Sequence, residues 1–285
     1  MRFFLKLALA ASAFAITAPA MAGVFILDGT DADDHGGATA TANLGGWQYI
    51  QKALENIASS TGLTRTQKTI AVLGSNSGSE AARAAQSAVA LSAALTGSGW
   101  NVVLLNDSQI TDFFNNTGVF QTSNASVLYM DSGGNVGGGI SSSEQAIIDG
   151  FATGINNFVG SGGGLFSMAQ GYGWLSALIP GLTVVDESNT GISLTPAGNT
   201  NFPGLTNADL STGPYHNSFA RTGAIPILGT SNATGNAVIL GGRGGSITVP
   251  GAVPEASTWM MMIAGFGIAG MSLRSRRRNA VASLA

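Results

Sequence analysis

Short apolar runs alternate with stretches of helical character through the first two thirds of the chain. Five such runs lie at residues 24–27, 70–73, 102–105, 127–130 and 165–168. The stretches of helical spacing or alanine-rich composition between them lie at residues 47–57, 80–95, 110–114, 144–159 and 172–179. A strand followed by a helix, repeated in this way, predicts an α/β fold with a mostly parallel sheet covered by helices on both faces.

The pattern changes after Pro180. Shorter apolar runs, separated by Gly, Asn, Thr and Pro, follow at residues 182–185, 192–194, 225–228, 237–240 and 247–249. We expect these runs to form strands and loops at one edge of the same domain. The sequence therefore predicts a single α/β domain over residues 23–240, followed by a linker over residues 241–252.

The N-terminal residues have the parts of a secretory signal peptide. Two basic residues precede an apolar stretch, and small side chains occupy the two positions that a signal peptidase reads. These features lie at Arg2, Lys6, residues 7–16, Ala20 and Ala22. We expect a signal peptide over residues 1–22, cleaved by signal peptidase before Gly23, so that the mature protein is exported. A buried N-terminal strand is the alternative interpretation.

An uncharged apolar segment near the C-terminus precedes a basic cluster. Residues 259–273 are fifteen residues without a charge, and as a helix they would span about 22 Å. A bilayer core is about 30 Å thick, so we expect a short transmembrane helix, extended by Trp259 at one interface and by arginine side chains at the other. The positive-inside rule places the arginines and residues 279–285 in the cytoplasm, and the domain on the far side of the membrane.

The order of parts at this end resembles the PEP-CTERM sorting signal of Gram-negative exosortase substrates, over residues 253–278. The residues that carry the resemblance are Val253, Pro254, Glu255, Trp259, Arg274, Arg276, Arg277 and Arg278. The resemblance implies a precursor held in the inner membrane, cleaved by exosortase near the Pro-Glu motif, and then released or attached to the cell envelope. Ala256 departs from the pattern, which usually has a second proline there, and an ordinary tail anchor is the alternative.

Removal of both ends leaves an acidic segment. Residues 23–250 contain six Lys and Arg against fourteen Asp and Glu, a formal net charge of −8. Such a surface disfavours nucleic acid as a partner and favours divalent cations. The chain has no cysteine, which excludes disulfides and thiolate chemistry.

Polar loops follow the predicted strands at the carboxyl end of the sheet, where open α/β sheets bind their ligands. These loops lie at residues 28–35, 75–79, 106–107, 131–135 and 167–172. The first contains four carboxylates and an imidazole, from Asp28, Asp31, Asp33, Asp34 and His35. They could bind Ca²⁺ or another divalent cation such as Zn²⁺ or Mn²⁺, although their spacing does not match an EF-hand. A solvated acidic turn is the alternative.

Residues 163–171 predict a strand that enters a tight turn and a helix, the geometry of a nucleophile elbow. Here the chain resembles the class I glutamine amidotransferase-like family, a flavodoxin-like three-layer sandwich whose elbow reads Gly-x-Cys-x-Gly. Ala169 stands at the nucleophile position, so the family's covalent mechanism would be absent. Ser167 is the neighbouring hydroxyl, and Ser167 with His216 is a weak candidate for a serine hydrolase.

These features together predict an exported cell-envelope or extracellular-matrix protein. The resemblance to exosortase substrates implies an association with exopolysaccharide and biofilm formation. We expect a non-catalytic binding or structural domain, with the acidic loop as the candidate site for a cation or a polar glycan. The alternative is an envelope hydrolase, with or without a metal, that uses His35 or His216 and an aspartate at the same edge.

Overall fold

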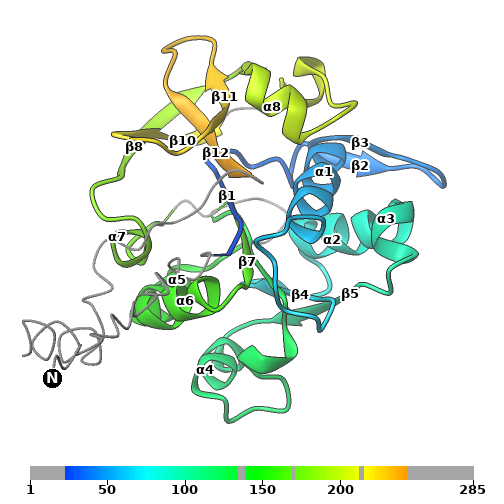
Figure 1. The fold of residues 1–285 in the computed structure, drawn as a ribbon, viewed down its shortest axis with the longest axis vertical. Helices are drawn as coiled ribbons and strands as arrows, with labels where there is room; N and C mark the ends of the chain where they lie inside the picture. Colours follow the sequence, from blue (N-terminus) through cyan, green and yellow to red (C-terminus); the bar gives the residue numbers. More distant parts are fainter. Residues whose placement is uncertain (1–22, 134–138, 169–170, 212–214, 243–285) are drawn as a thin grey trace, which may run out of the picture. The chain divides into compact units, whose positions relative to one another are not determined.

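The computed structural model describes residues 23–133, 139–168, 171–211 and 215–242 (Figure 1). Within these ranges the chain forms a ten-stranded sheet and a separate two-stranded sheet. The predicted signal peptide, the sorting signal and its transmembrane helix lie outside the described residues. Among the helices that the structure describes, none is long and apolar enough to cross a membrane.

Five parallel strands form one half of the large sheet, in the order β5-β4-β6-β7-β1. They are β1 (Phe25–Asp28), β4 (Thr69–Leu73), β5 (Asn101–Leu105), β6 (Val127–Met130) and β7 (Gly164–Ser167). The five apolar runs of the sequence match these strands to within one residue at each end. The predicted α/β fold with a parallel central sheet is therefore confirmed.

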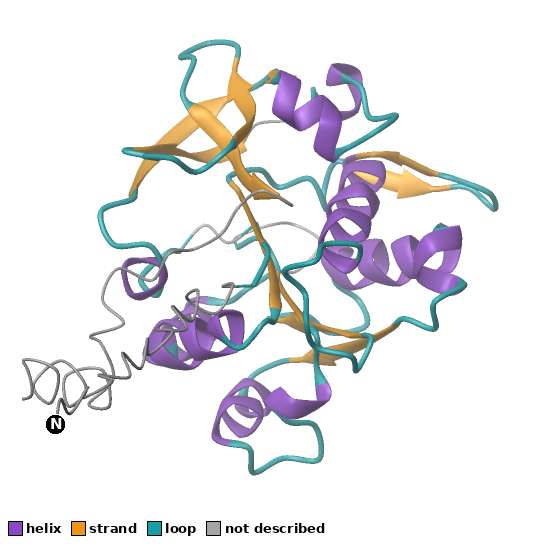
Figure 2. Ribbon diagram, viewed as in Figure 1, coloured by secondary structure: helices purple, strands orange, loops and turns teal. Residues whose placement is uncertain are grey.

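Antiparallel strands extend the sheet beyond β1 (Figure 2). They are β12 (Ala237–Gly242), β10 (Tyr215–Ala220), β8 (Thr183–Asn189), β11 (Ile227–Ser231) and β9 (Ile192–Leu194). Four of the expected runs, 182–185, 192–194, 225–228 and 237–240, overlap these strands, and the fifth, 247–249, lies outside the described residues. The strand β10 was not predicted, because Asn217 and Ser218 are buried in it and interrupt the apolar pattern.

Helices cover both faces of the parallel strands, an arrangement compatible with a flavodoxin-like three-layer sandwich. One face carries α1 (Gly46–Ala58), α2 (Glu80–Leu91) and α3 (Ala93–Thr96). The other carries α4 (Ser108–Asn115), α5 (Ser142–Gly150), α6 (Ala152–Gly160) and α7 (Leu175–Leu178). Side chains along β1 point alternately to the two faces of the sheet, so Ile26 packs against the first set of helices and Leu27 against the second.

Several helices differ from the expected ranges. The stretch 80–95 divides at Ser92, whose hydroxyl accepts a hydrogen bond from the Leu95 amide and begins α3. The stretch 144–159 divides at Phe151 into α5 and α6, and α7 is shorter than the expected 172–179. The hairpin of β2 (Gly36–Ala38) and β3 (Asn43–Gly45) and the short α8 (Pro196–Asn201) were not predicted, because they contain few apolar residues.

The neighbouring strands β4 and β6 are followed by helices that pack on opposite faces of the sheet. After β4 the chain continues into α2 on one face, and after β6 into α5 on the other, so loops diverge between these two strands. We call the loops that follow β1, β4, β6 and β7 the carboxyl edge, and the segments that precede these strands the amino edge. The chain leaves the described domain at the amino edge, since Gly242 pairs with Phe25 at the start of β1.

Candidate functional site

The carboxyl edge begins with Asp28, the last residue of β1. One of its carboxylate oxygens accepts a hydrogen bond from the Thr30 amide at 3.0 Å, and the other accepts one from the Thr30 hydroxyl at 2.7 Å. Complete burial raises the pKa of Asp28 to about 7, although the hydrogen bonds from Thr30 lower it. Asp28 thus closes a turn of its own loop, in the way that aspartate stabilises tight turns.

Two further carboxyl groups connect the loops that diverge at the centre of the sheet. The Ser132 hydroxyl lies 2.8 and 2.9 Å from the two carboxylate oxygens of Asp33, so the loop after β6 contacts the loop after β1. The Ser75 hydroxyl, after β4, donates to Oδ2 of Asp131, after β6. These contacts join three strand ends across the switch point of the fold.

Asp33 and Asp131 form an interacting pair inside this connection. Burial raises the pKa of both carboxyl groups, and the charge of Asp33 raises that of Asp131 further. The hydrogen bonds from Ser132 and Ser75 act in the opposite direction. Both residues are at most 2 % exposed, and Oδ1 of Asp131 has no hydrogen-bond partner within the described residues. The pair is therefore out of reach of a substrate in solution.

Both histidines of the chain contact the same carboxylate oxygen. Nε2 of His35 lies 3.3 Å from Oδ2 of Asp31, and Nε2 of His216, on β10, lies 3.1 Å from it. The Asp31 side chain is 8 % exposed, whereas those of His35 and His216 are 30 % and 34 % exposed. This cluster is the accessible part of the carboxyl edge. Its members Asp31 and His216 are 185 positions apart in the chain, so no local pattern in the sequence brings them together.

Asp34 lies beside this cluster, in a hollow of about 420 Å³ lined with residues of the loop and the hairpin. The lining residues are Asp34, His35, Gly36, Gly37, Leu44 and Gly45. Burial raises the pKa of Asp34 to about 6, and the charges of Asp33 and Asp31 contribute to the increase. Of the five predicted metal ligands, Asp34 and His35 line this hollow. Asp28 and Asp33 are buried and do not line it.

The five predicted metal ligands share one loop but make separate contacts. Asp28 is bound by Thr30, Asp33 by Ser132 and Asp31 by the two histidines. Within the part of the chain that the structure describes, no three His, Asp or Glu side chains are placed to hold a metal ion. The cation site in this loop stays a prediction.

Ser167 ends β7 and is completely buried. Its hydroxyl interacts with Tyr172, whose own hydroxyl donates to the Asp28 carbonyl oxygen at 2.8 Å. The structure describes no hydrogen bond between Ser167 and His216, and the latter contacts Asp31 instead. The next helix, α7, begins only at Leu175, and Ala169 lies outside the described residues.

The comparison with known families concerns the C-terminus. The model of the PEP-CTERM protein-sorting motif matches residues 252–278. The chain carries a PEP-CTERM sorting signal. PEP-CTERM signals are recognised by exosortase, so this chain is an exported protein that exosortase processes, with a precursor anchored at least transiently in the membrane.

The PEP-CTERM match extends over the sorting signal and not over the folded domain. No curated protein and no solved structure matches the chain. The resemblance to the amidotransferase-like family is not confirmed.

Proposed function

We propose that this chain is a cell-envelope or extracellular-matrix protein whose α/β domain binds or supports other components and does not catalyse a reaction. Signal peptidase would release the mature N-terminus at Gly23, and exosortase would cleave near Pro254. The domain would then be released or attached to the envelope, in association with exopolysaccharide or biofilm. The acidic loop would bind a divalent cation or a polar glycan.

One observation supports the non-catalytic role above all others: the polar groups at the centre of the carboxyl edge are buried and bound to one another. Asp33, Asp131 and Ser167 are at most 2 % exposed. A nucleophile and its base must reach the substrate and each other, and Ser167 and His216 have different partners. These hydroxyl and carboxyl groups hold loops together, which is the role of a structural network.

The contacts of Asp31 with both histidines favour one alternative, an envelope hydrolase at the same edge. A carboxylate that orients an imidazole is a common arrangement for a general base. In such an enzyme the exposed His216 would act on water, with or without a bound metal, and Asp31 would orient it.

The two roles differ in their response to substitution at Asp31 and His216. The full chain would be assayed in a neutral detergent against ester, amide and glycoside substrates, together with Asp31→Asn, His216→Gln and the control Asp186→Asn, at an exposed position on β8. The binding role predicts no turnover that depends on Asp31 or His216. Turnover that falls at least 100-fold in both variants, and not in the control, would establish the hydrolase.

Processing by exosortase has its own test. In a host that has exosortase, the double variant Pro254→Ala, Glu255→Ala should accumulate as the uncleaved precursor. Ala256→Pro is the matched control, because it restores the proline of the usual motif and should be cleaved at least as completely as the parent chain. Equal cleavage of both variants would contradict a role for the Pro-Glu motif.

A further inference from the structure

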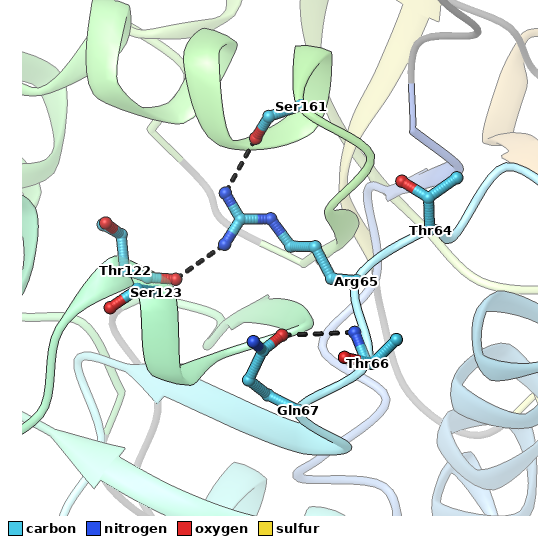
Figure 3. Close-up of a pocket in the computed structure, with 7 residues that line it drawn as sticks. All are labelled: Thr64, Arg65, Thr66, Gln67, Thr122, Ser123 and Ser161. Carbon is cyan, nitrogen blue, oxygen red and sulfur yellow. Dashed lines mark hydrogen bonds between the residues drawn. The ribbon is translucent and has the colours of Figure 1, made fainter.

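A second hollow lies at the amino edge, opposite the acidic loop. It has a volume of about 400 Å³. Its lining residues precede β4, β6 and β7, and they are Thr64, Arg65, Thr66, Gln67, Thr122, Ser123 and Ser161 (Figure 3). The lining thus consists of five hydroxyls, one amide and one guanidinium. It contains no carboxylate, although the segment 23–250 is strongly acidic.

Arg65 is held in position by groups from two other segments of the chain, residues 122–125 and 158–161. Nη1 donates to the Thr122 carbonyl oxygen at 2.7 Å, and Nη2 donates to the Ser161 hydroxyl at 2.7 Å (Figure 3). Nη1 also donates to the Ala125 carbonyl oxygen at 3.3 Å. The guanidinium carbon lies 4.1 Å from the centre of the Phe158 ring. A cation fixed in this way loses little conformational entropy when it binds a ligand.

Within the described residues, no carboxylate pairs with the charge of Arg65. The ion pairs within the described residues use Lys52, Arg83 and the histidines, and none involves Arg65. Burial lowers the pKa of Arg65, and its Nε has no acceptor within the described residues. Nε is itself buried, so the N–H of Nη2 that is not used by Ser161 is the donor left for a ligand. An anion oxygen that accepts from it would also supply the opposite charge that this half-buried cation lacks.

The rest of the lining indicates what kind of anion fits. The hydroxyls of Thr64, Thr66 and Ser123 and the Gln67 amide can each donate and accept hydrogen bonds, as a hydroxylated ligand requires. The lining contains no large apolar side chain that would bind an acyl chain. We infer that this hollow binds an acidic sugar unit, with the sugar carboxylate at Arg65 and the sugar hydroxyls at the threonine, serine and glutamine side chains.

This inference rests on the proposed binding role, and it names a ligand class and a site other than the acidic loop. The test is saturation-transfer NMR at low salt on the full chain in a neutral detergent, with glucuronate as the probe and glucose as its uncharged counterpart. We expect millimolar binding of glucuronate, and at least tenfold weaker binding of glucose. No binding of glucuronate, or equal binding of the two sugars, would overturn the inference.

Variants locate the binding in the hollow. Arg65→Gln should weaken glucuronate binding at least tenfold, whereas Lys68→Gln, which removes the same charge from the same loop outside the lining, should change it less than twofold. Because Arg65 also connects three segments, Ser123→Asp is a second variant, which places a carboxylate in the lining and should weaken binding at least tenfold. Equal effects of Arg65→Gln and Lys68→Gln, or no effect of Ser123→Asp, would contradict the site.

Two further measurements separate this inference from other results. Binding to vesicles that contain an anionic phospholipid, abolished by Ser123→Asp while glucuronate does not bind, would assign the hollow to a lipid headgroup and overturn the sugar assignment. Processing by exosortase does not depend on Arg65, so a cleaved chain that fails to bind glucuronate would refute this inference alone.

Discussion

At the carboxyl edge, the buried charge belongs to carboxyl groups that accept hydrogen bonds from serine and threonine hydroxyls. At the amino edge it belongs to Arg65, which donates to two carbonyl oxygens and one hydroxyl. The carboxyl groups of Asp28, Asp33 and Asp131 have raised pKa values and can lose their charge by binding a proton. The guanidinium stays charged across the physiological range. The two edges should therefore respond differently to pH.

The largest effect expected is a loss of stability as the pH rises. The unfolded Asp28 carboxyl releases its proton near pH 3.8, but the folded one keeps it to about pH 7, so its contribution is complete below pH 3.8 and is lost between these values. At about 1.4 kcal/mol per pH unit, Asp28 alone could account for up to about 4 kcal/mol. Asp33 and Asp131 act in the same direction.

Urea unfolding of the full chain between pH 4 and pH 8 checks this prediction. Asp28→Asn should flatten the decrease in the free energy of unfolding, because the amide cannot ionise. The exposed Asp186→Asn should leave the slope as it is. A free energy of unfolding that increases from pH 4 to pH 7 in the parent chain would show that these carboxyl groups are ionised in the folded state.

Arg65→Ala should have the next largest effect, a loss of about 2–4 kcal/mol, because it removes charge-assisted hydrogen bonds and the contact with Phe158. This loss should be the same at pH 5 and at pH 8, in contrast to the effects at the carboxyl edge. Thermal unfolding at the two pH values measures it. Lys68→Gln is the control and should cost less than about 0.5 kcal/mol.

Ser75→Ala and Ser132→Ala should each cost about 1–2 kcal/mol, because each leaves a buried carboxyl oxygen without its donor. The cost should increase with pH, since an ionised carboxylate needs the donor more than a protonated one. A double-mutant cycle would measure the coupling between the two serines through the Asp33–Asp131 pair. Additive effects would show that the two loops are held independently.

The smallest effects are expected at the two histidines. His35→Gln and His216→Gln should each lower the free energy of unfolding by no more than about 1 kcal/mol, because both histidines are partly exposed where they contact Asp31. Chemical unfolding at pH 7 measures this. A loss above about 2 kcal/mol for either variant would mean that the Asp31 cluster is a structural centre of the domain.

The sequence allowed prediction of the parallel strands and of the loops at their carboxyl ends. Four of the five apolar runs are buried on both faces, and the run 102–105 on the edge strand β5 is partly buried. Burial on both faces requires consecutive apolar residues, and such runs can be recognised in the sequence. The runs also placed Ser75 and Asp131 at one edge, because each follows such a strand. The pairing of Asp33 with Ser132, or of Asp31 with His216, depends on strand order, which local patterns do not determine.

Other features had no local signal at all. The strands of the hairpin β2–β3 are three residues long, contain three glycines between them and have no alternating apolar pattern. The hollow around Arg65 brings together residues from 64–67, 122–123 and 161, whose individual segments look like ordinary polar loops. Arg65 looks like any other loop arginine in the sequence, and only the fold shows that no carboxylate among the described residues pairs with it. Sites built from long-range contacts therefore need the structure.

The most direct test of this account is the intact mass, with mapping of the C-terminal peptide, of the chain recovered from envelope and medium of two hosts, one with exosortase and one without. The account predicts a product that begins at Gly23 and ends near Pro254 only in the host that has exosortase. A chain that keeps Arg274 to Arg278 in both hosts would contradict processing by exosortase and leave a domain tethered to the membrane.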